Sequence, residues 1–156
     1  MIIIEDTRQQ AGKHEIKHRH FHNHGVSVLR SKLPFGDYAA PPRVAIDTKE
    51  NMLEIAGNIC GTSKEHIRFK NECIKARDCG CKLIILVENE EGIKSINDVF
   101  RWQNPRLDYS PNACTGERLA KTMLTMSDRY GIEFKFCTPI EAPHIIMEIL
   151  QDDNVR

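Results

Sequence analysis

The stretch "FGDYAAPPRVAIDTKEN", residues 35 to 51, decides the fold prediction for this chain. Its two prolines cannot donate hydrogen bonds to a strand ladder, so Pro41-Pro42 indicates a turn. The apolar run after them ends in Asp-Thr-Lys, and residues 26 to 49 read as an antiparallel hairpin with its returning strand at 43 to 49. Because side chains in a strand alternate between its two faces, Asp47 and Lys49 point to the same side.

Helical and strand patterns extend from this hairpin in both directions. The run "IIIE" at 2 to 5 is typical of a short buried strand, and "CKLIILVEN" at 81 to 89 is typical of a central strand covered on both faces. The overall order is β-α-β-β-α-α-β-α-β-α, which predicts an α/β fold with a mixed central sheet flanked by helices, in a single domain over residues 1–156. Helices are expected at 13–24, 52–60, 63–78, 95–103, 115–131 and 138–152, a further strand at 132–138, and a loop at 104–114.

The overall charge excludes one class of nucleic-acid binder. Lys and Arg number 22 and Asp and Glu also number 22, so the 156-residue chain has a formal net charge of zero. A basic protein can bind a polyanion through its global field, but this chain cannot. Any nucleic-acid contact is therefore expected to use a local basic patch or a metal ion.

The cysteines and the apolar segments bear on the compartment. The six cysteines form no C-x-x-C pair, and no apolar run approaches the roughly 20 residues of a membrane span. The sequence shows no signal peptide. These features favour a cytoplasmic protein that makes no membrane contact and keeps its thiols reduced, as small core residues.

Two aspartates of the hairpin are candidate metal ligands. The hairpin brings Asp37 close to Asp47, and two close carboxylates repel unless a cation neutralises them. Oxygen ligands of this kind favour Mg²⁺ or Mn²⁺, and Asp6, at the end of the first strand, is a candidate third ligand. Lys49 would then stabilise charge on a phosphate, so Asp37, Asp47 and Lys49 are the predicted catalytic residues for phosphodiester hydrolysis. The alternative is a plain salt bridge between Asp47 and Lys49 on a solvated strand.

The order of these motifs resembles the XPF-type nuclease domain, a branch of the PD-(D/E)xK superfamily with the restriction-endonuclease-like fold. Asp6-Thr7-Arg8 matches the family's first element and Gly36-Asp37 its second. Asp47-Thr48-Lys49 matches the third in role, with Asp for the family's Glu and Thr for its Arg. The family's fourth acid falls on Leu53, so that element is missing here.

The resemblance implies a divalent-metal-dependent DNA endonuclease, which in this family often acts at branched or flapped DNA. It also implies that the chain can form a homodimer. Members often carry a C-terminal helix-hairpin-helix module, and none is expected here. The small size favours a phage or bacterial source. The alternative function is a non-catalytic nucleic-acid-binding or dimerisation module of the same fold.

The segment 13 to 24, "KHEIKHRHFHNH", is the most basic part of the chain. With Arg8, its Lys13, Lys17 and Arg19 are the predicted DNA-contacting residues. Its histidines lie four residues apart in two sets, His14, His18 and His22 on one stripe and His20 and His24 on another. They allow three interpretations: a solvated helix face, a phosphate-contacting face, or a zinc site.

Three further residues have two interpretations each. Glu88 ends the strand at 81 to 89 and suits either a salt bridge or a position near the metal. Glu72 is more typical of a helix surface than of a site. Trp102 could stack on a base, although partly buried packing is more common for such a residue.

Overall fold

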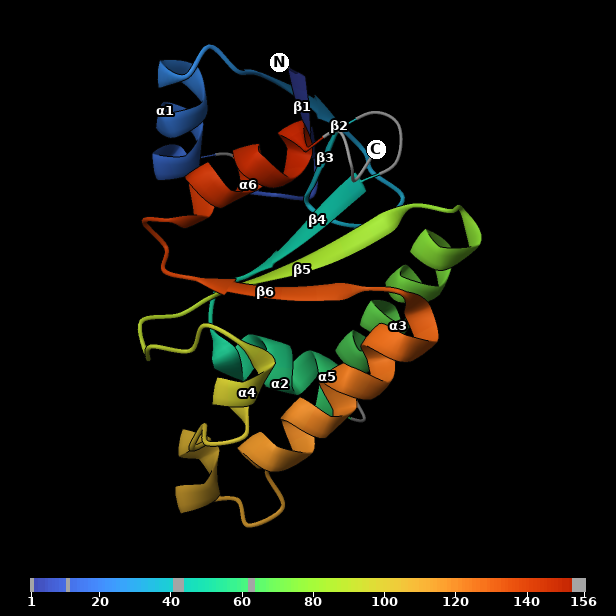
Figure 1. The fold of residues 1–156 in the computed structure, drawn as a ribbon, viewed down its shortest axis with the longest axis vertical. Coiled ribbons are helices and arrows are strands. Elements are labelled where there is room, and N and C mark those ends of the chain that lie inside the picture. Colours follow the sequence, from blue (N-terminus) through green and yellow to red (C-terminus); the bar gives the residue numbers. More distant parts are fainter. Residues whose placement is uncertain (1, 11, 41–43, 62–63, 153–156) are drawn as a thin grey trace.

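A six-stranded mixed sheet forms the centre of the molecule in the computed structural model, which describes residues 2–10, 12–40, 44–61 and 64–152 (Figure 1). Its strand order is β2-β1-β3-β4-β5-β6. The strands are β1 (Ile2–Asp6), β2 (Ser27–Ser31), β3 (Tyr38–Ala40), β4 (Val44–Lys49), β5 (Lys82–Glu88) and β6 (Glu133–Cys137).

The predicted antiparallel hairpin over residues 26 to 49 is confirmed for β3 and β4, and it is wrong for β2. β3 and β4 pair antiparallel, with Tyr38 opposite Ile46. β2 instead lies at the sheet edge, parallel to β1. The chain leaves β2 before Leu33, whose amide binds Asp6, and re-enters the sheet on the other side of β1. The expected turn at Pro41-Pro42 lies outside the described residues.

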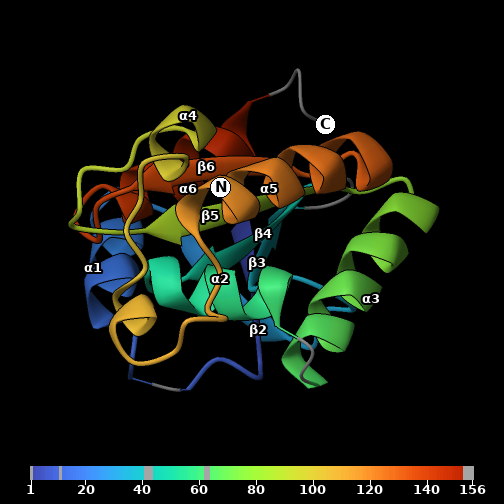
Figure 2. The ribbon, with the colours of Figure 1, turned by 90° about the horizontal axis from the view of Figure 1, so that it is seen from below.

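Helices cover both faces of the sheet (Figures 1 and 2). One face carries α1 (Glu15–Asn23) and α6 (Ala142–Gln151); the other carries α2 (Met52–Cys60), α3 (Lys64–Asp78), α4 (Ile96–Val99) and α5 (Gly116–Tyr130). The predicted helix at 95–103 is therefore only one turn long, and the predicted loop at 104–114 contains a short 3₁₀ helix, Pro105–Asp108. The expected fold class, an α/β sheet flanked by helices in one compact domain, is confirmed.

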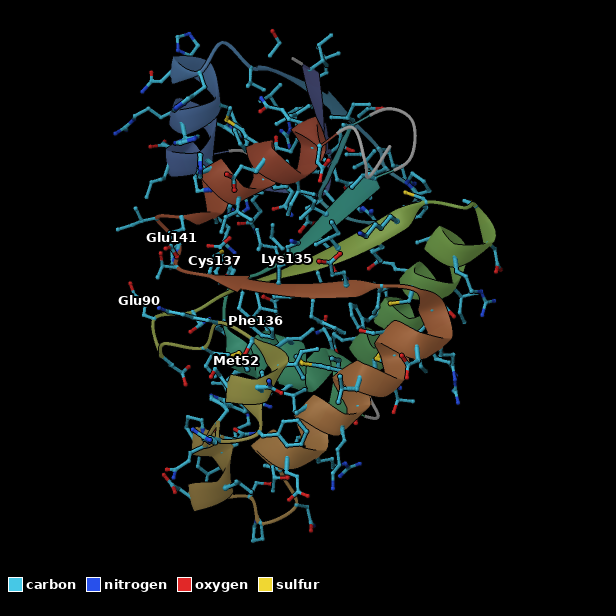
Figure 3. All side chains as sticks on the ribbon, viewed as in Figure 1. Met52, Glu90, Lys135, Phe136, Cys137 and Glu141 are labelled. Atoms are coloured by element: carbon cyan, nitrogen blue, oxygen red, sulfur yellow. A yellow bond between two sulfur atoms is a disulfide. The ribbon has the colours of Figure 1, made fainter. Side chains whose placement is uncertain are left out.

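Strand alternation divides the core into two layers. Along β4, Ala45 packs toward α2, α3 and α5, whereas Val44 and Ile46 pack toward α1 and α6. β6 repeats the pattern: Phe136 lies on the α2 side and Cys137 on the α6 side (Figure 3). Side chains two residues apart in a strand lie on the same face of the sheet. The side chains of residues 47 and 49 of β4 therefore share the face of Ala45 and are directed toward α2 and α3.

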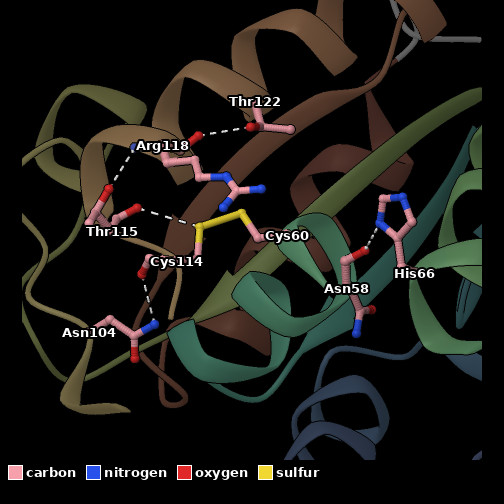
Figure 4. The surroundings of a disulfide bond; sticks show 8 residues. All are labelled: Asn58, Cys60, His66, Asn104, Cys114, Thr115, Arg118 and Thr122. Carbon is pink, nitrogen blue, oxygen red and sulfur yellow. Dashed lines mark hydrogen bonds between the residues drawn. A yellow bond between two sulfur atoms is a disulfide. The ribbon is translucent and has the colours of Figure 1, made fainter. Parts of the chain in front are cut away.

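Cys60 at the end of α2 and Cys114 just before α5 form a disulfide across 54 residues of sequence (Figure 4). The Asn104 side chain donates a 2.8 Å hydrogen bond to the Cys114 carbonyl and fixes the same loop. The expectation of reduced thiols is wrong for this pair, and right for Cys73, Cys79, Cys81 and Cys137, which are free. Sequence spacing could not show the pairing, because the two sulfur atoms meet only after α2 and α5 pack together.

None of the helices in the described part of the chain is long and apolar enough to cross a membrane.

Candidate active site

Three aspartates lie in a row across adjacent strands. Glu5 pairs with Tyr38 and Tyr38 with Ile46, so the next positions along place Asp6 beside Asp37 and Asp37 beside Asp47. Two backbone bonds extend the ladder through the row, each 2.7 Å long: Asp6 N to Asp37 O, and Asp37 N to Ile46 O. The row lies where β1 and β4 end and β3 begins, and its side chains face α2 and α3.

Gly36 is required by the approach of the chain to β4. Its φ of +72° lies in the left-handed region, which glycine adopts without steric cost. An added Cβ would stand 3.1 Å from the Ile46 carbonyl oxygen and 3.3 Å from the Ala45 Cβ. The Gly-Asp pair is therefore a structural unit: the glycine lets the backbone approach β4, and that approach positions the Asp37 carboxylate.

Gly36→Ala is expected to lower the free energy of unfolding by about 2–3 kcal/mol, because both backbone strain and a tight contact oppose the new methyl group. Gly25→Ala is the matched control, because Gly25 has a similar φ of +67° but no atom within 4 Å of the position that an added methyl group would take. That control is expected to cost about 1–2 kcal/mol, from strain alone. Urea unfolding measures both. Equal losses would show that the contact with β4 is unimportant.

Asp37, Asp47 and Lys49 open into one cavity of about 280 Å³. This volume has room for a hydrated cation and a phosphodiester group. The other charged side chains that line it are Arg8, Lys13, Glu50, Glu54, Arg68 and Glu72.

Asp47 and Lys49 form a buried ion pair inside the cavity. Their side chains are 7% and 5% exposed, and Lys49 Nζ lies 2.8 Å from Asp47 Oδ2. Apart from this contact with the Lys49 ammonium, Asp47 Oδ2 is buried and has no hydrogen-bond partner among the described residues. Burial raises the pKa of Asp47 against the attraction of Lys49. Asp47 raises the pKa of Lys49 in turn, although burial opposes that charge. The predicted alternative of a solvated surface salt bridge does not fit this burial.

Thr48, which lies between Asp47 and Lys49 in β4, holds the Asp37 side chain in place. Asp37 Oδ2 accepts hydrogen bonds from the backbone N–H and the hydroxyl of Thr48, at 2.7 and 2.8 Å. Thr48 stands where the resembled family has Arg, and here it orients the neighbouring carboxylate. Asp37 therefore has a fixed position beside Asp47. Both bonds from Thr48 go to Oδ2, so neither of them uses Oδ1.

Asp6 differs from the other two aspartates because its carboxylate is fully engaged. Oδ1 accepts from the backbone N–H and Nε of Arg8, both at 2.7 Å, and Oδ2 accepts from Arg8 Nη2 and the Leu33 amide. Burial opposes ionisation of Asp6, but these bonds outweigh it and lower its pKa. Asp6 does not line the cavity; Arg8 does. We infer that Asp6 positions Arg8 and is not itself a metal ligand, contrary to the prediction from the sequence.

Asp6→Asn is expected to lower the free energy of unfolding at pH 7 by about 1–3 kcal/mol, because the amide NH₂ must face groups that also donate. The folded-state pKa lies below the usual value of 3.8, so this stabilisation is complete above pH 3.8 and declines as the pH falls through the folded-state pKa. Unfolding measured at several pH values should show the two chains converging in acid. Asp78→Asn is the control, an exposed partner of Arg77 whose loss should change little. A pH-independent difference, or none, would contradict this role.

Two residues of α3 complete the cavity wall: Glu72, for which the sequence favoured a plain helix surface, and Arg68, which the sequence alone did not single out. Glu72 is mostly buried, with Oε1 3.9 Å from Arg8 Nη1. Burial raises the pKa of Glu72, while Lys49, Arg68 and Arg8 lower it. Glu72 and Arg68 are four residues apart and share a face of α3. That spacing is a weak signal, because it is equally typical of a solvated helix face.

The predicted DNA-contacting residues divide into two groups. Arg8 and Lys13 line the cavity, and Lys13 forms an ion pair with Glu50. Lys17 is buried against Glu88, with Nζ 2.5 Å from Oε1, so its ammonium is unavailable to a ligand at the surface. Arg19 is exposed but does not line the cavity. The basic segment therefore contributes only its beginning to this site.

Glu88 and Trp102 lie outside the cavity. The Lys17 pair favours the salt-bridge interpretation of Glu88. Trp102 is 6% exposed and its Nε1 donates a 2.7 Å hydrogen bond to Glu91 Oε2. Such burial favours packing and leaves little ring surface for stacking on a base.

The cavity residues fit a hard divalent cation. Mg²⁺ commonly binds through one or two carboxylates and keeps several waters. Asp37 and Asp47 supply such a pair, and Asp47 Oδ2 already has a cationic neighbour, the Lys49 ammonium, as its one close partner among the described residues. Within the described ranges, no three His, Cys, Asp or Glu side chains are already gathered around one point. The chain therefore offers two carboxylates, and water would complete the coordination.

Comparison with known proteins gives matches of structure only. No protein-family profile and no curated protein sequence matches this chain. XPF from Aeropyrum pernix is similar in structure, with a TM-score of 0.69, 16% identity and coverage of 97% of this chain and 64% of that one. The same protein in complex with DNA has a TM-score of 0.68 and 18% identity over 96% of this chain and 63% of that one. This chain spans less than two thirds of either. The chain therefore has the fold of an XPF-type nuclease.

Proposed function

We propose that this chain is a divalent-metal-dependent DNA endonuclease. One observation carries the proposal: Asp37, Asp47 and Lys49, from two strands of an XPF-type nuclease fold, open into a single polar cavity. The similarity to a structure that contains DNA supports the choice of polymer. Mg²⁺ or Mn²⁺ is the proposed cofactor, because the available ligands are carboxylate oxygens.

The proposed roles follow from the positions of the side chains. A divalent cation, when bound, polarises the phosphodiester and lowers the pKa of a water molecule. Asp37 and Asp47 would hold it. Lys49, buried beside Asp47, would present its ammonium to charge that develops on the phosphate during cleavage. The Lys49 side chain is 5% exposed, and a charge so weakly screened by solvent would be effective.

The formal charge balance of the cavity indicates that a bound cation would favour the entry of DNA. Five carboxylates line it (Asp37, Asp47, Glu50, Glu54 and Glu72), and four cationic side chains do (Arg8, Lys13, Lys49 and Arg68). The formal charge of the lining is therefore −1, and one divalent cation would change it to +1. A negative cavity repels a phosphodiester and a positive one attracts it, so the metal would control substrate binding as well as chemistry.

Arg8 and Arg68 are the proposed phosphate contacts at the cavity. Arg8 is half exposed and is held by Asp6, so its guanidinium is oriented before any ligand arrives. Asp6 and the Leu33 carbonyl engage Nε and Nη2 of Arg8, so its Nη1 is the nitrogen that would meet a phosphate oxygen. Lys13, also half exposed, would add a point charge at the rim.

The second candidate function is a non-catalytic nucleic-acid-binding or dimerisation module of the same fold. Thr48 and Leu53 favour it, because they replace an arginine and an acid of the resembled family. Burial of the Asp47–Lys49 pair is consistent with both functions. A degenerate module would tolerate loss of that pair without any change in its binding to DNA.

A cleavage assay separates the two functions. Single-stranded, duplex, flapped, forked and four-way DNA would each be incubated with the chain and Mg²⁺ or Mn²⁺, with Asp47→Asn as the inactive control. We expect metal-dependent cleavage, strongest on a branched or flapped substrate. Binding to these DNAs without cleavage in either metal would favour the non-catalytic module and overturn the nuclease proposal.

A further inference from the structure

Three histidines from two helices meet on the face of the sheet opposite the candidate active site. His20 and His24 lie one turn apart on α1, with ring centres 4.1 Å apart. His144 comes from α6, and its ring centre is 6.2 Å from that of His20. Phe21 and Ile146, buried in the same core layer, hold the two helices together beneath them.

The hydrogen bonds leave a nitrogen lone pair available on each ring. His24 Nδ1 lies 2.8 Å from the His20 carbonyl oxygen, so Nδ1 must donate and Nε2 keeps its lone pair. His144 Nε2 lies 3.2 Å from Glu148 Oε1, so its Nδ1 is the ring nitrogen directed away from this carboxylate. His20 Nε2 is buried and has no hydrogen-bond partner among the described residues. A buried imidazole nitrogen without a partner calls for a specific explanation.

In many metal sites a ligating histidine places its second ring nitrogen beside a carbonyl or a carboxylate, as His144 Nε2 does with Glu148 Oε1.

We propose that His20, His24 and His144 form a binding site for a borderline transition-metal ion such as Zn²⁺, with Glu148 orienting His144. Two imidazoles bound to one zinc at about 2.0–2.1 Å hold their ring centres roughly 5 Å apart. The observed 4.1 and 6.2 Å lie on either side of that value. The described side chains do not converge on one point, because the His20 and His24 rings are stacked. Closure of the site requires rotation of the exposed His24 and His144 rings, and it gives up the present His24 bond to the His20 carbonyl.

This site differs from the carboxylate cavity in both chemistry and purpose. Imidazole nitrogens select Zn²⁺, Cu²⁺ or Ni²⁺, whereas carboxylates suit Mg²⁺. The bound ion would clasp α1 to α6. Since Lys13 and His14, just before α1, line the carboxylate cavity, the clasp would brace one of its walls. The ion would act on structure and would take no part in phosphodiester cleavage.

Zinc binding measured by calorimetry tests the proposal on the intact chain. Excess Mg²⁺ occupies the carboxylate cavity, and Cys79→Ser with Cys81→Ser in every variant removes the more accessible free thiols. His20→Gln and His144→Gln are compared with His22→Gln, an exposed histidine of α1 outside the cluster. We expect one zinc per chain, at least tenfold weaker binding in the first two variants, and unchanged binding in the third. Circular dichroism checks that each variant is folded; His144, on the surface of α6, is the safer of the two substitutions.

Several results would overturn the proposal. They are absence of zinc binding by the parent chain, unchanged affinity in His144→Gln, and equal weakening by His22→Gln, which would assign the metal to α1 histidines in general. None of these outcomes depends on DNA cleavage. The zinc site and the proposed nuclease function can therefore fail separately.

Discussion

Asp47→Asn is expected to reduce metal-dependent DNA cleavage by about 10³-fold or more, which corresponds to at least about 4 kcal/mol of transition-state stabilisation. The substitution keeps the shape of the side chain but removes the charge that would hold the cation beside Asp37. It also leaves Lys49 without the carboxylate 2.8 Å from its ammonium. Initial cleavage rates on the preferred DNA, at saturating Mg²⁺, measure the loss.

The matched control is Glu54→Gln, which removes a carboxylate from the cavity rim. Glu54 is 39% exposed and lies 4.0 Å from the Lys49 ammonium. It should reduce the cleavage rate far less than Asp47→Asn. Equal losses in both variants would show that cleavage responds only to the total charge of the cavity, and would remove Asp47 from its proposed role.

Lys49→Met is expected to reduce cleavage by about 10²-fold, or roughly 2.7 kcal/mol, while Mn²⁺ binding is retained. Methionine preserves an apolar stem near Phe69, whose ring centre lies 5.3 Å from the ammonium, but it removes the charge itself. In this variant the bound Mn²⁺ would neutralise Asp47 in place of the Lys49 ammonium. The affinity of the chain for Mn²⁺ should therefore be unchanged or higher. Single-turnover rates and a Mn²⁺ titration of the same variant separate the two effects.

Lys13→Met is the control for the position of the charge. Lys13 is 49% exposed at the rim, so its loss should weaken DNA binding and leave the saturated rate nearly intact. Near-parental rates in Lys49→Met would reduce Lys49 to a structural ion pair. They would also favour the non-catalytic module over the nuclease.

The central part of the candidate site could be predicted from the sequence because it depends on local rules. Strand alternation places Asp47 and Lys49 on one face, and the antiparallel pairing of β3 with β4 brings Asp37 beside them. The sheet and its two helical layers follow from apolar runs and helical periodicity. Each of these signals lies within a few residues of the feature that it predicts.

Features that depend on distant packing could not be predicted in this way. Glu72 and Arg68 reach the cavity because α3 packs across the face of β4 and β5, and nothing in the α3 segment marks which side faces the site. Lys17 looks like any other basic residue of its segment, yet the docking of α1 buries it against Glu88, 71 positions away. Asp6 resembles a ligand until the chain after β2 brings the Leu33 amide to its carboxylate.

The central claim, that Asp37 and Asp47 together hold a divalent cation, is tested most directly by calorimetric titration of the folded chain with Mn²⁺. We predict one Mn²⁺ per chain in the parent and in Lys49→Met, and loss of that binding in both Asp37→Asn and Asp47→Asn. Asp6→Asn should retain it, because the Asp6 carboxylate is already occupied by Arg8 and Leu33. Mn²⁺ binding that survives in both Asp37→Asn and Asp47→Asn would contradict the account.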